Sequence, residues 1–319
     1  MEVLFSDPAV VTLVLITFLA ATVNGALGYG FSSLTVPVAL LFYTNRVLNP
    51  ALVLLEVIIN SYVLVMNRRG LPQVWCRVLP LLVGLVPGVL IGSYALAAVH
   101  PGWIKFLTYA VILPFILIQA AGFRRYIKSE RAVSVPFGAG VGILYSVTTI
   151  SGPPLALLFN NQGYVKEEFR AGLALVRIAE SSLTATAYYF LGLYSSTTPQ
   201  LMLMIVPSVI LGVPLGIALL RRIEAETFRR VCMSFDAWVV GFGLSRTLIE
   251  LGVLASPQAY SVLAVTIVVD GWLLFRYFAK AGKKHPSAFT QPSPPPAVYS
   301  PHPQGTTDSF PRTDVSLSS

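Results

Sequence analysis

Hydrophobic positions along this chain gather into long runs that are separated by short polar or basic stretches. A helix needs about 20 mostly apolar residues to cross the hydrocarbon core of a bilayer. The runs that reach roughly this length are 48–66, 75–99, 103–123, 168–190, 199–220, 228–250 and 258–279. The pattern therefore predicts an all-α fold, a polytopic membrane helical bundle.

Two other apolar stretches, 9–43 and 135–160, are interrupted halfway by small and helix-breaking residues. The first break runs from Asn24 to Ser33 and is rich in glycine, whereas the second, 148–154, ends in Gly-Pro-Pro. Because unpaired backbone groups are not tolerated in lipid, a broken helix at membrane depth must lie inside protein or beside a water-filled cavity. We therefore expect each stretch to form a broken or re-entrant helix pair in the interior of the bundle.

The two halves of the chain resemble each other at a nearly constant spacing. The matching segments are Pro37–Phe42 with Pro154–Phe159, Gly88–Gly92 with Gly212–Gly216, and Glu56 with Glu180. Inverted repeats that contain broken helices are a recurrent design of secondary transporters. The sequence thus predicts two inverted repeats, each beginning with a broken helix pair.

A division of the chain follows from these matches. Residues 1–285 are expected to form a transmembrane domain, with repeat 1 at about 9–125, repeat 2 at about 135–250 and an extra helix at 258–279. The remaining residues, 286–319, are rich in Pro, Ser and Thr and have little that could build a core, so we expect a disordered tail.

Charge adds a topology to this picture. Only 11% of the residues are charged, against about 25% in soluble domains, which excludes a water-soluble protein. The net charge is +8, but the basic residues flank the apolar runs, which is typical of cytoplasmic membrane loops and not of a nucleic-acid surface. We expect a multi-pass protein of the cell (inner) membrane, surrounded by lipid, with its C-terminal tail in the cytoplasm.

The breaks supply most of the candidate binding residues. A break exposes helix N-termini, whose free N–H groups and dipole attract anions, and nearby hydroxyls can donate hydrogen bonds to oxyanions. The candidate substrate-binding residues at the breaks are Asn24, Gly28, Gly30, Ser32, Ser33, Thr148, Thr149, Ser151 and Gly152. The alternative is that these small residues only allow tight helix packing.

Ionisable residues inside the predicted spans are the other candidates, because charge is costly in hydrocarbon and usually faces a cavity or a partner. Arg177 could bind an anion in bidentate fashion, or could form an internal ion pair with Glu180, one turn away. Glu56 and Glu180 could carry a coupling proton. Asp236 and Asp270 are interpreted as polar contacts between helices.

Other motifs point to structure, and none points to catalysis. The Gly-x-x-x-Gly motifs at 88–92 and 212–216 favour close helix contact. The sequence has no zinc-protease motif, nucleophile elbow, phosphate-binding loop or dinucleotide fingerprint, so we expect no enzyme activity, no cofactor and no metal site.

Four segments together resemble the TauE/SafE family of sulfite and organosulfonate exporters. They are the stretch from Asn24 to Pro37, the Asn49-Pro50 opening of the next run, the segment Gly142–Pro154 and the element Pro87–Gly92. The likeness covers about 10–280 and implies a carrier of small sulfur-containing anions whose paired breaks line the translocation path. The second break is poorer in glycine than the family's pattern, a departure that bears on the substrate more than on the family.

The resulting hypothesis is a secondary transporter that exports small anions, such as sulfite or organosulfonates, by alternating access. Two alternatives stay open on the sequence: a non-transporting membrane scaffold or assembly protein, whose internal charges only hold helices together, and an anion channel. Association with further copies of the same chain is also left open.

Overall fold

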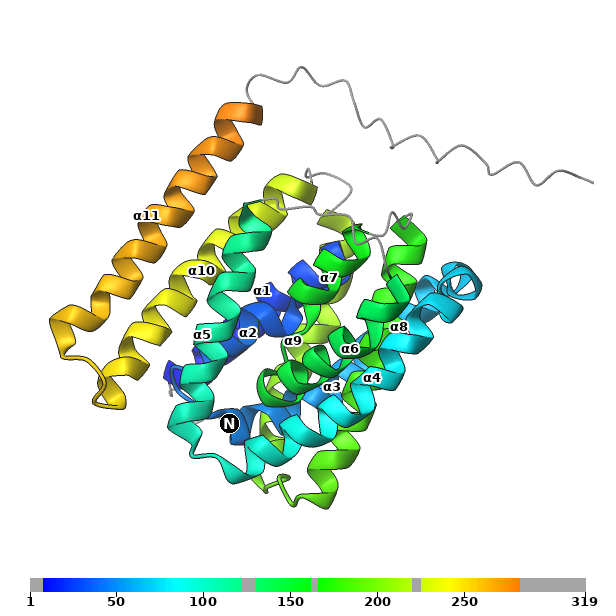
Figure 1. The fold of residues 1–319 in the computed structure, drawn as a ribbon, viewed down its shortest axis with the longest axis horizontal. Helices are drawn as coiled ribbons and strands as arrows, with labels where there is room; N and C mark the ends of the chain where they lie inside the picture. Colours follow the sequence, from blue (N-terminus) through cyan, green and yellow to red (C-terminus); the bar gives the residue numbers. More distant parts are fainter. Residues whose placement is uncertain (1–7, 122–129, 162–165, 220–224, 282–319) are drawn as a thin grey trace, which may run out of the picture. The chain divides into compact units, whose positions relative to one another are not determined.

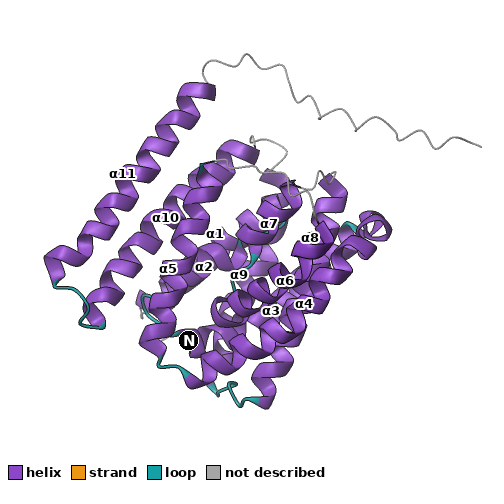
Figure 2. Ribbon diagram, in the orientation of Figure 1, coloured by secondary structure: helices purple, strands orange, loops and turns teal. Residues whose placement is uncertain are grey.

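A computed structural model describes residues 8–121, 130–161, 166–219 and 225–281 of the chain. Every regular element within these ranges is helical, as Figures 1 and 2 show. The chain divides into two compact units, Met1–Phe278 and Ala279–Ser319. The tail predicted at 286–319 lies outside the described residues, as does most of the basic stretch 124–131.

The helices follow one another with short connections. In chain order they are α1 (Pro8–Leu27), α2 (Phe31–Ala39), α3 (Asn45–Met66), the 3-10 turn η2 (Arg68–Gly70), α4 (Leu71–Ala98), α5 (Pro101–Ala120), α6 (Glu130–Thr148), α7 (Gly152–Asn161), α8 (Lys166–Phe190), α9 (Thr197–Leu219), α10 (Ala225–Glu250) and α11 (Ser256–Ala281). The all-α prediction is confirmed. Both interrupted stretches are broken as expected, the first between α1 and α2 and the second between α6 and α7.

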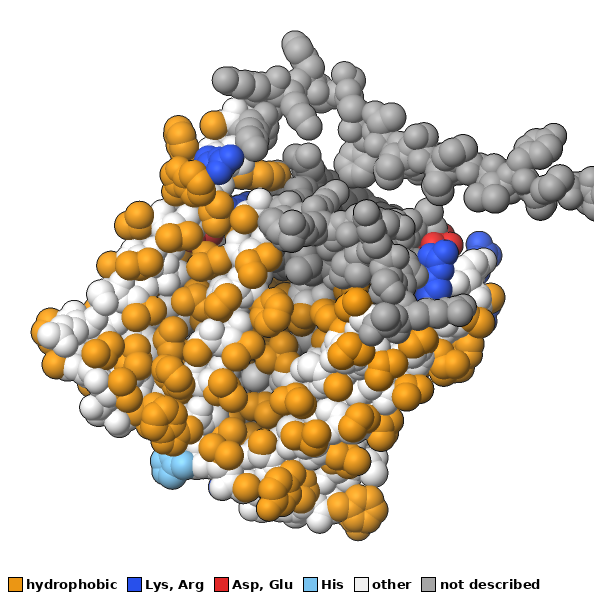
Figure 3. Space-filling view, in the orientation of Figure 1, with side chains coloured by type: hydrophobic (Ala, Val, Ile, Leu, Met, Phe, Trp, Pro, Cys, Tyr) orange, Lys and Arg blue, Asp and Glu red, His pale blue; other side chains and the backbone are white. Residues whose placement is uncertain are grey.

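Six segments among the described residues are long and apolar enough to cross a membrane. They are Pro8–Ala26, Asn45–Met66, Arg68–Ala98, Pro101–Ile118, Thr197–Leu219 and Ser256–Ala279. Apolar side chains cover most of the face seen in Figure 3, and the basic and acidic side chains lie near its edge. A surface of this kind suits lipid and not water, so the prediction of a membrane protein is confirmed.

The predicted spans 168–190 and 228–250 form helices α8 and α10 but carry more polar residues than those six segments. Several of their charged side chains turn inward. Arg177, Glu180 and Asp236 are each at most 4% exposed. Charged side chains that face the interior of a membrane protein usually have a partner or line a cavity. The buried charged residues of α8 and α10 are therefore candidates for a functional site inside the bundle.

Helix packing is reciprocal between the two halves of the chain. Helix α1 packs against α9, and α6 packs against α4; likewise α2 contacts α10, and α7 contacts α5. Helices α3 and α8, one from each half, also pack against each other. Figure 1 shows α4, α6 and α8 together on one side and α5 and α10 on the other. A duplicated chain would produce this exchange, and the inverted orientation of the halves stays a prediction.

The Gly-x-x-x-Gly motifs lie where helices from opposite halves come closest. A Cβ atom at Gly88 would collide with the carbonyl of Ala139 in α6, and one at Gly216 would collide with the carbonyl of Thr22 in α1. Backbones can approach this closely only where no side chain intervenes. The predicted role in close helix contact is confirmed.

The two breaks are closed by the same local device. The amide of Gly28 donates to the carbonyl of Asn24 (2.7 Å), and the amide of Thr149 donates to the carbonyl of Tyr145 (2.6 Å). Both residues are left-handed, with φ of 84° at Gly28 and 58° at Thr149. Glycine adopts this conformation freely, whereas a β-branched residue is strained in it. Asn24 and Tyr145 therefore occupy matching positions, four residues before each break.

Replacing Gly216 by alanine should lower the free energy of unfolding by about 1–3 kcal/mol, because the added methyl group overpacks the α1–α9 contact. Chemical unfolding in mixed micelles measures the change. Gly140, in α6, is the matched control, since a Cβ atom there would meet nothing within 4 Å. Its replacement by alanine should raise stability by about 0.5–1 kcal/mol. Equal effects at both positions would contradict the close-contact role.

Replacing Thr149 by glycine should stabilise the protein by about 1 kcal/mol, because it relieves a strained backbone conformation. The same change at Thr148 should destabilise it, since the Thr148 hydroxyl accepts a hydrogen bond from the amide of Ile150 (3.1 Å). Unfolding measurements on the two variants compare the gain in stability from relieving strain at Thr149 with the loss from removing the Thr148–Ile150 hydrogen bond. A loss of stability at Thr149 as large as at Thr148 would refute the strain.

Candidate functional site

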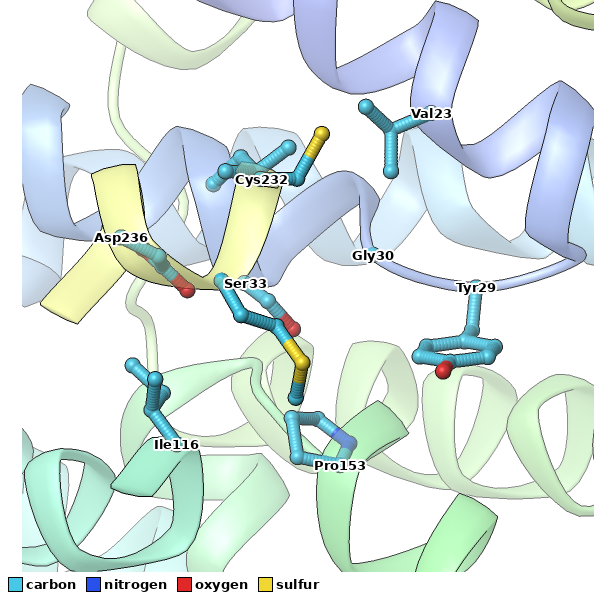
Figure 4. Close-up of a pocket in the computed structure, with 10 residues that line it drawn as sticks. Val23, Tyr29, Gly30, Ser33, Ile116, Pro153, Cys232 and Asp236 are labelled. Atoms are coloured by element: carbon cyan, nitrogen blue, oxygen red, sulfur yellow. The ribbon is translucent and has the colours of Figure 1, made fainter. Parts of the chain in front are cut away.

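The two breaks meet in the interior of the bundle. A Cβ atom at Gly152, the first residue of α7, would lie 3.4 Å from the Tyr29 ring and 3.8 Å from the amide of Gly30. Gly30 also lies against Val23, so the chain turns back on α1 after the first break, as Figure 4 shows. The two breaks, which the sequence places near the start of each half, are thus neighbours in space.

A small pocket of about 30 Å³ lies between the breaks and α10. Figure 4 shows Ser33, Pro153 and Asp236 around this space. Its volume suits about one or two waters and not an anion with three oxygens. This pocket is therefore too small to be where such an anion binds.

Beside this pocket, the Glu56 side chain of α3 is the centre of a buried hydrogen-bonding cluster. Glu56 is 0% exposed. Its Oε1 accepts a hydrogen bond from the Ser32 hydroxyl (2.6 Å) and one from Nη2 of Arg177 (2.5 Å). Its Oε2 accepts from the Tyr145 hydroxyl (2.7 Å). One carboxylate therefore joins the first break, α6 and α8.

Glu180 of α8 makes the matching contact with the second break. Its Oε1 accepts a hydrogen bond from the Ser151 hydroxyl, and Nε of Arg177 is 4.0 Å from the same oxygen. The other carboxylate oxygen, Oε2, has no hydrogen-bond partner among the described residues. In each half, then, a serine at the start of a short helix donates to a glutamate of the neighbouring long helix.

Arg177 lies between these two carboxylates and is 1% exposed. The sequence left open whether it binds an anion or pairs with Glu180, and the structure gives it a shorter ion pair with Glu56 (2.5 Å) than with Glu180 (4.0 Å). Its Nε and Nη1 donate no hydrogen bond within the described part of the chain. A buried guanidinium with two unused nitrogens can still bind an oxyanion.

We define the cluster by the side chains of Glu56, Arg177 and Glu180. It holds two carboxyl groups against one guanidinium. When both carboxyls are ionised, its net charge is −1. An uncompensated charge in a dry interior is costly. An added anion would make the local charge more negative.

Side chains from opposite halves satisfy the carbonyls that the breaks leave free. Nδ2 of Asn49 and Nδ2 of Asn45 donate to the carbonyl of Val147 at the end of α6 (2.7 and 3.3 Å). Nη2 of Arg170 donates to the carbonyl of Ala26 at the end of α1 (2.8 Å). Each broken helix end is therefore capped by a polar residue of the long helix from the other half.

The nine predicted residues of the breaks separate into five groups. Ser32 and Ser151 join the cluster. Gly30 and Ser33 line the small pocket, and Gly152 lies against the first break. Asn24 and Gly28 line a different, larger cavity of about 230 Å³.

The remaining two, Thr148 and Thr149, hydrogen-bond only to their own segment. The Thr148 hydroxyl donates to the carbonyl of Leu144 and accepts from the amide of Ile150, while the Thr149 hydroxyl donates to the carbonyl of Thr148. The second break also presents few N–H groups, because Pro153 and Pro154 have none. Binding by free amides is therefore weaker there than the sequence suggested.

Sequence reasoning missed three residues that the structure places at the site. Tyr145 and Ser181 hydrogen-bond to each other (2.8 Å) and extend the Glu56 cluster. Arg170 caps α1 and lines the larger cavity. The signal for Tyr145 was its position four residues before the second break, which matches Asn24. Asp236, interpreted from the sequence as a contact between helices, faces the small pocket instead.

Metal chemistry has little support in this geometry. Among the described residues no group of three or more His, Cys, Asp or Glu side chains is arranged to hold a metal ion. The hydroxyls, carboxyls and single guanidinium of the cluster are suited to hydrogen bonding, proton exchange and anion binding.

Comparisons with known proteins agree with the resemblance seen in the sequence. The model of the family described as Sulfite exporter TauE/SafE matches residues 13–242, which include both breaks and the whole Glu56–Arg177–Glu180 cluster. Searches of curated proteins and of solved structures gave no match. Since the matched region is most of the chain, the protein belongs to the sulfite exporter TauE/SafE family.

Proposed function

We propose that this protein is a secondary transporter that exports small anions, such as sulfite or organosulfonates, across the cell membrane by alternating access. The observation that carries the proposal is the buried Arg177, held between hydroxyls and carboxylates from both halves with two guanidinium nitrogens unused. Family membership supports the same class of cargo.

Arg177 is the residue that recognises the anion. The Nη1 and Nη2 end of its guanidinium presents parallel N–H groups that match two oxygens of a sulfite or sulfonate group, and Nη2 also donates to Glu56. Ser32 and Ser151 now donate to Glu56 and Glu180, and can turn to the anion when those carboxyls are protonated. The closed state therefore already holds the groups that an oxyanion needs.

The cluster couples anion and proton binding. An anion that joins two carboxylates and one guanidinium would bring the local charge to −2 or below. Protonation of Glu56 or Glu180 removes this penalty, so anion and proton favour each other's binding. The direction of net movement then follows the gradients of both, which permits export when the anion is concentrated inside.

Alternating access follows from the way in which the short helices are attached. Helix α2 is joined to α3 by the Ser32–Glu56 hydrogen bond, and α7 is joined to α8 by the Ser151–Glu180 hydrogen bond. Release of one of these bonds would open one side of the site while the other stays closed. The glycine-rich first break is suited to such hinge movement.

Exchanging the charges of Glu56 and Arg177 separates recognition from structure. Glu56→Arg and Arg177→Glu alone should each lower the free energy of unfolding by about 3–5 kcal/mol, because each leaves buried charge unpaired. The double variant should regain most of the stability but no sulfite flux, since the guanidinium has moved to α3. Unfolding in micelles and flux into liposomes measure the two effects.

The matched control is the exposed pair Arg246–Glu250, whose side chains are 49% and 44% exposed. Its exchange should change stability by less than about 1 kcal/mol and leave transport intact. Full sulfite flux in the Glu56–Arg177 double variant would show that this pair is structural only, and would contradict the recognition role.

Replacing Glu180 by glutamine should uncouple transport from the proton. The amide keeps a hydrogen-bond acceptor for Ser151 but cannot take up a proton. An outside pH below the inside pH should accelerate sulfite uptake into wild-type vesicles, and this effect should disappear in Glu180→Gln while exchange of labelled for unlabelled sulfite continues. Glu250→Gln, at the exposed pair, is the control. Persistence of the pH effect in both Glu180→Gln and Glu56→Gln would contradict coupling through the cluster.

A further inference from the structure

The largest cavity described lies beside the first break, between α1, α3, α8 and α9. Its volume is about 230 Å³, which is several times the roughly 30 Å³ that one water occupies in the liquid. We call it the Arg170 cavity. It is lined by Asn24 of α1 and Gly28 just after it, by Tyr62 of α3 and Asn67 just after it, and by Arg170 of α8. It has room for a small anion together with water.

Charge in the Arg170 cavity favours an anion. Of the described residues that line it, Arg170 alone carries a full charge. Its Nη2 donates to the carbonyl of Ala26, and its guanidinium makes no other hydrogen bond to a described residue, which leaves its remaining N–H groups for another acceptor. The absence of a side chain at Gly28 gives the Arg170 stem its place, 3.5 Å from where a Cβ atom would be.

Asn24 provides an independent sign that a ligand belongs here. It is 0% exposed, and neither its amide nitrogen nor its amide oxygen has a hydrogen-bond partner among the described residues. Buried side-chain amides are rarely left unpaired, because desolvation costs about 1–3 kcal/mol. A bound oxyanion would accept a hydrogen bond from Nδ2, and an accompanying water would donate one to Oδ1.

The location of the cavity relates it to the buried cluster. Arg170 precedes Arg177 by two turns of α8, a rise of about 10 Å. Asn67 is followed directly by the basic turn Arg68–Gly70, which the charge pattern assigns to the cytoplasm. An anion arriving from that side would meet Arg170 before Arg177.

We propose that the Arg170 cavity is a separate outer binding site for a small oxyanion, in which Arg170 and Asn24 hold the anion at the cytoplasmic entrance to the Arg177 cluster. The site captures and concentrates the anion, and the cluster moves it. The identification of this ligand with the cargo rests on the proposed function, whereas the binding site itself does not.

Thiol modification of the full-length protein in detergent tests the site without transport. The reporter is Asn67→Cys in a chain whose Cys76 and Cys232 are replaced by serine. Two methanethiosulfonate reagents of similar size are compared, one ending in a sulfonate and one in a trimethylammonium group. Mass spectrometry gives the ratio of the two modification rates at the reporter. The reference is the same ratio at Cys76, which is exposed, measured in the protein with its native cysteines.

We expect the reporter to favour the anionic reagent relative to Cys76, and methanesulfonate to slow its modification. Arg170→Gln should lower the rate ratio about tenfold, because it removes the charge that concentrates anions in the cavity. Arg170→Lys should keep most of the preference, which also controls for loss of the Ala26 cap. Arg68→Gln removes a nearby exposed charge that does not line the cavity, and should have a much smaller effect.

Equal rate ratios in Arg170→Gln and Arg68→Gln, or modification that methanesulfonate does not slow, would overturn the outer site. The experiment also separates this inference from the proposed function. If wild-type vesicles move no sulfite or sulfonate while the Arg170-dependent preference persists, the transport proposal fails and the site stands. If vesicles transport but the preference is absent, the site fails alone.

Discussion

The structure depends on one constraint: a helix that stops inside a membrane protein must have its free polar groups satisfied by other parts of the chain. Both α1 and α6 end this way. The long helices α3 and α8 meet the requirement with Asn45 and Asn49 on one side and Arg170 on the other. Because each cap comes from the opposite half, the breaks can exist only where the halves are packed together, and this brings Glu56, Arg177 and Glu180 into one buried cluster.

The helical fold and the positions of both breaks were predictable from the sequence, because hydropathy sets helix length and Gly, Pro and Ser mark where helices stop. Residue pairing was not. Arg177 has Glu180 one turn away, yet its shorter ion pair is with Glu56 of another helix. The directions of side chains on packed helices decide such choices, and one sequence does not contain them. For the same reason the sequence did not single out Tyr145 or Arg170. Tyr145 lies four residues before the second break, and Arg170 lies two helical turns before Arg177.

The arrangement gives the broken helices two different tasks. At the cluster, the serines at the breaks donate hydrogen bonds to the two carboxylates that flank the buried Arg177, and these breaks do not form an open anion site themselves. On the other side of the first break, Asn24 and Gly28 border a cavity large enough for an anion and near the basic turn. In the proposed carrier, an anion would move from this cavity, where Arg170 supplies positive charge, to the buried cluster around Arg177.

The most direct test of recognition by Arg177 is crystallography of the full chain with selenite, in which selenium replaces the sulfur of sulfite and can be located by anomalous scattering. We expect a selenium peak beside the guanidinium of Arg177, between Glu56 and Glu180, with selenite oxygens at hydrogen-bonding distance from its N–H groups. Selenium density confined to positions away from Arg177, in a protein that still transports selenite, would contradict the central role given to this arginine.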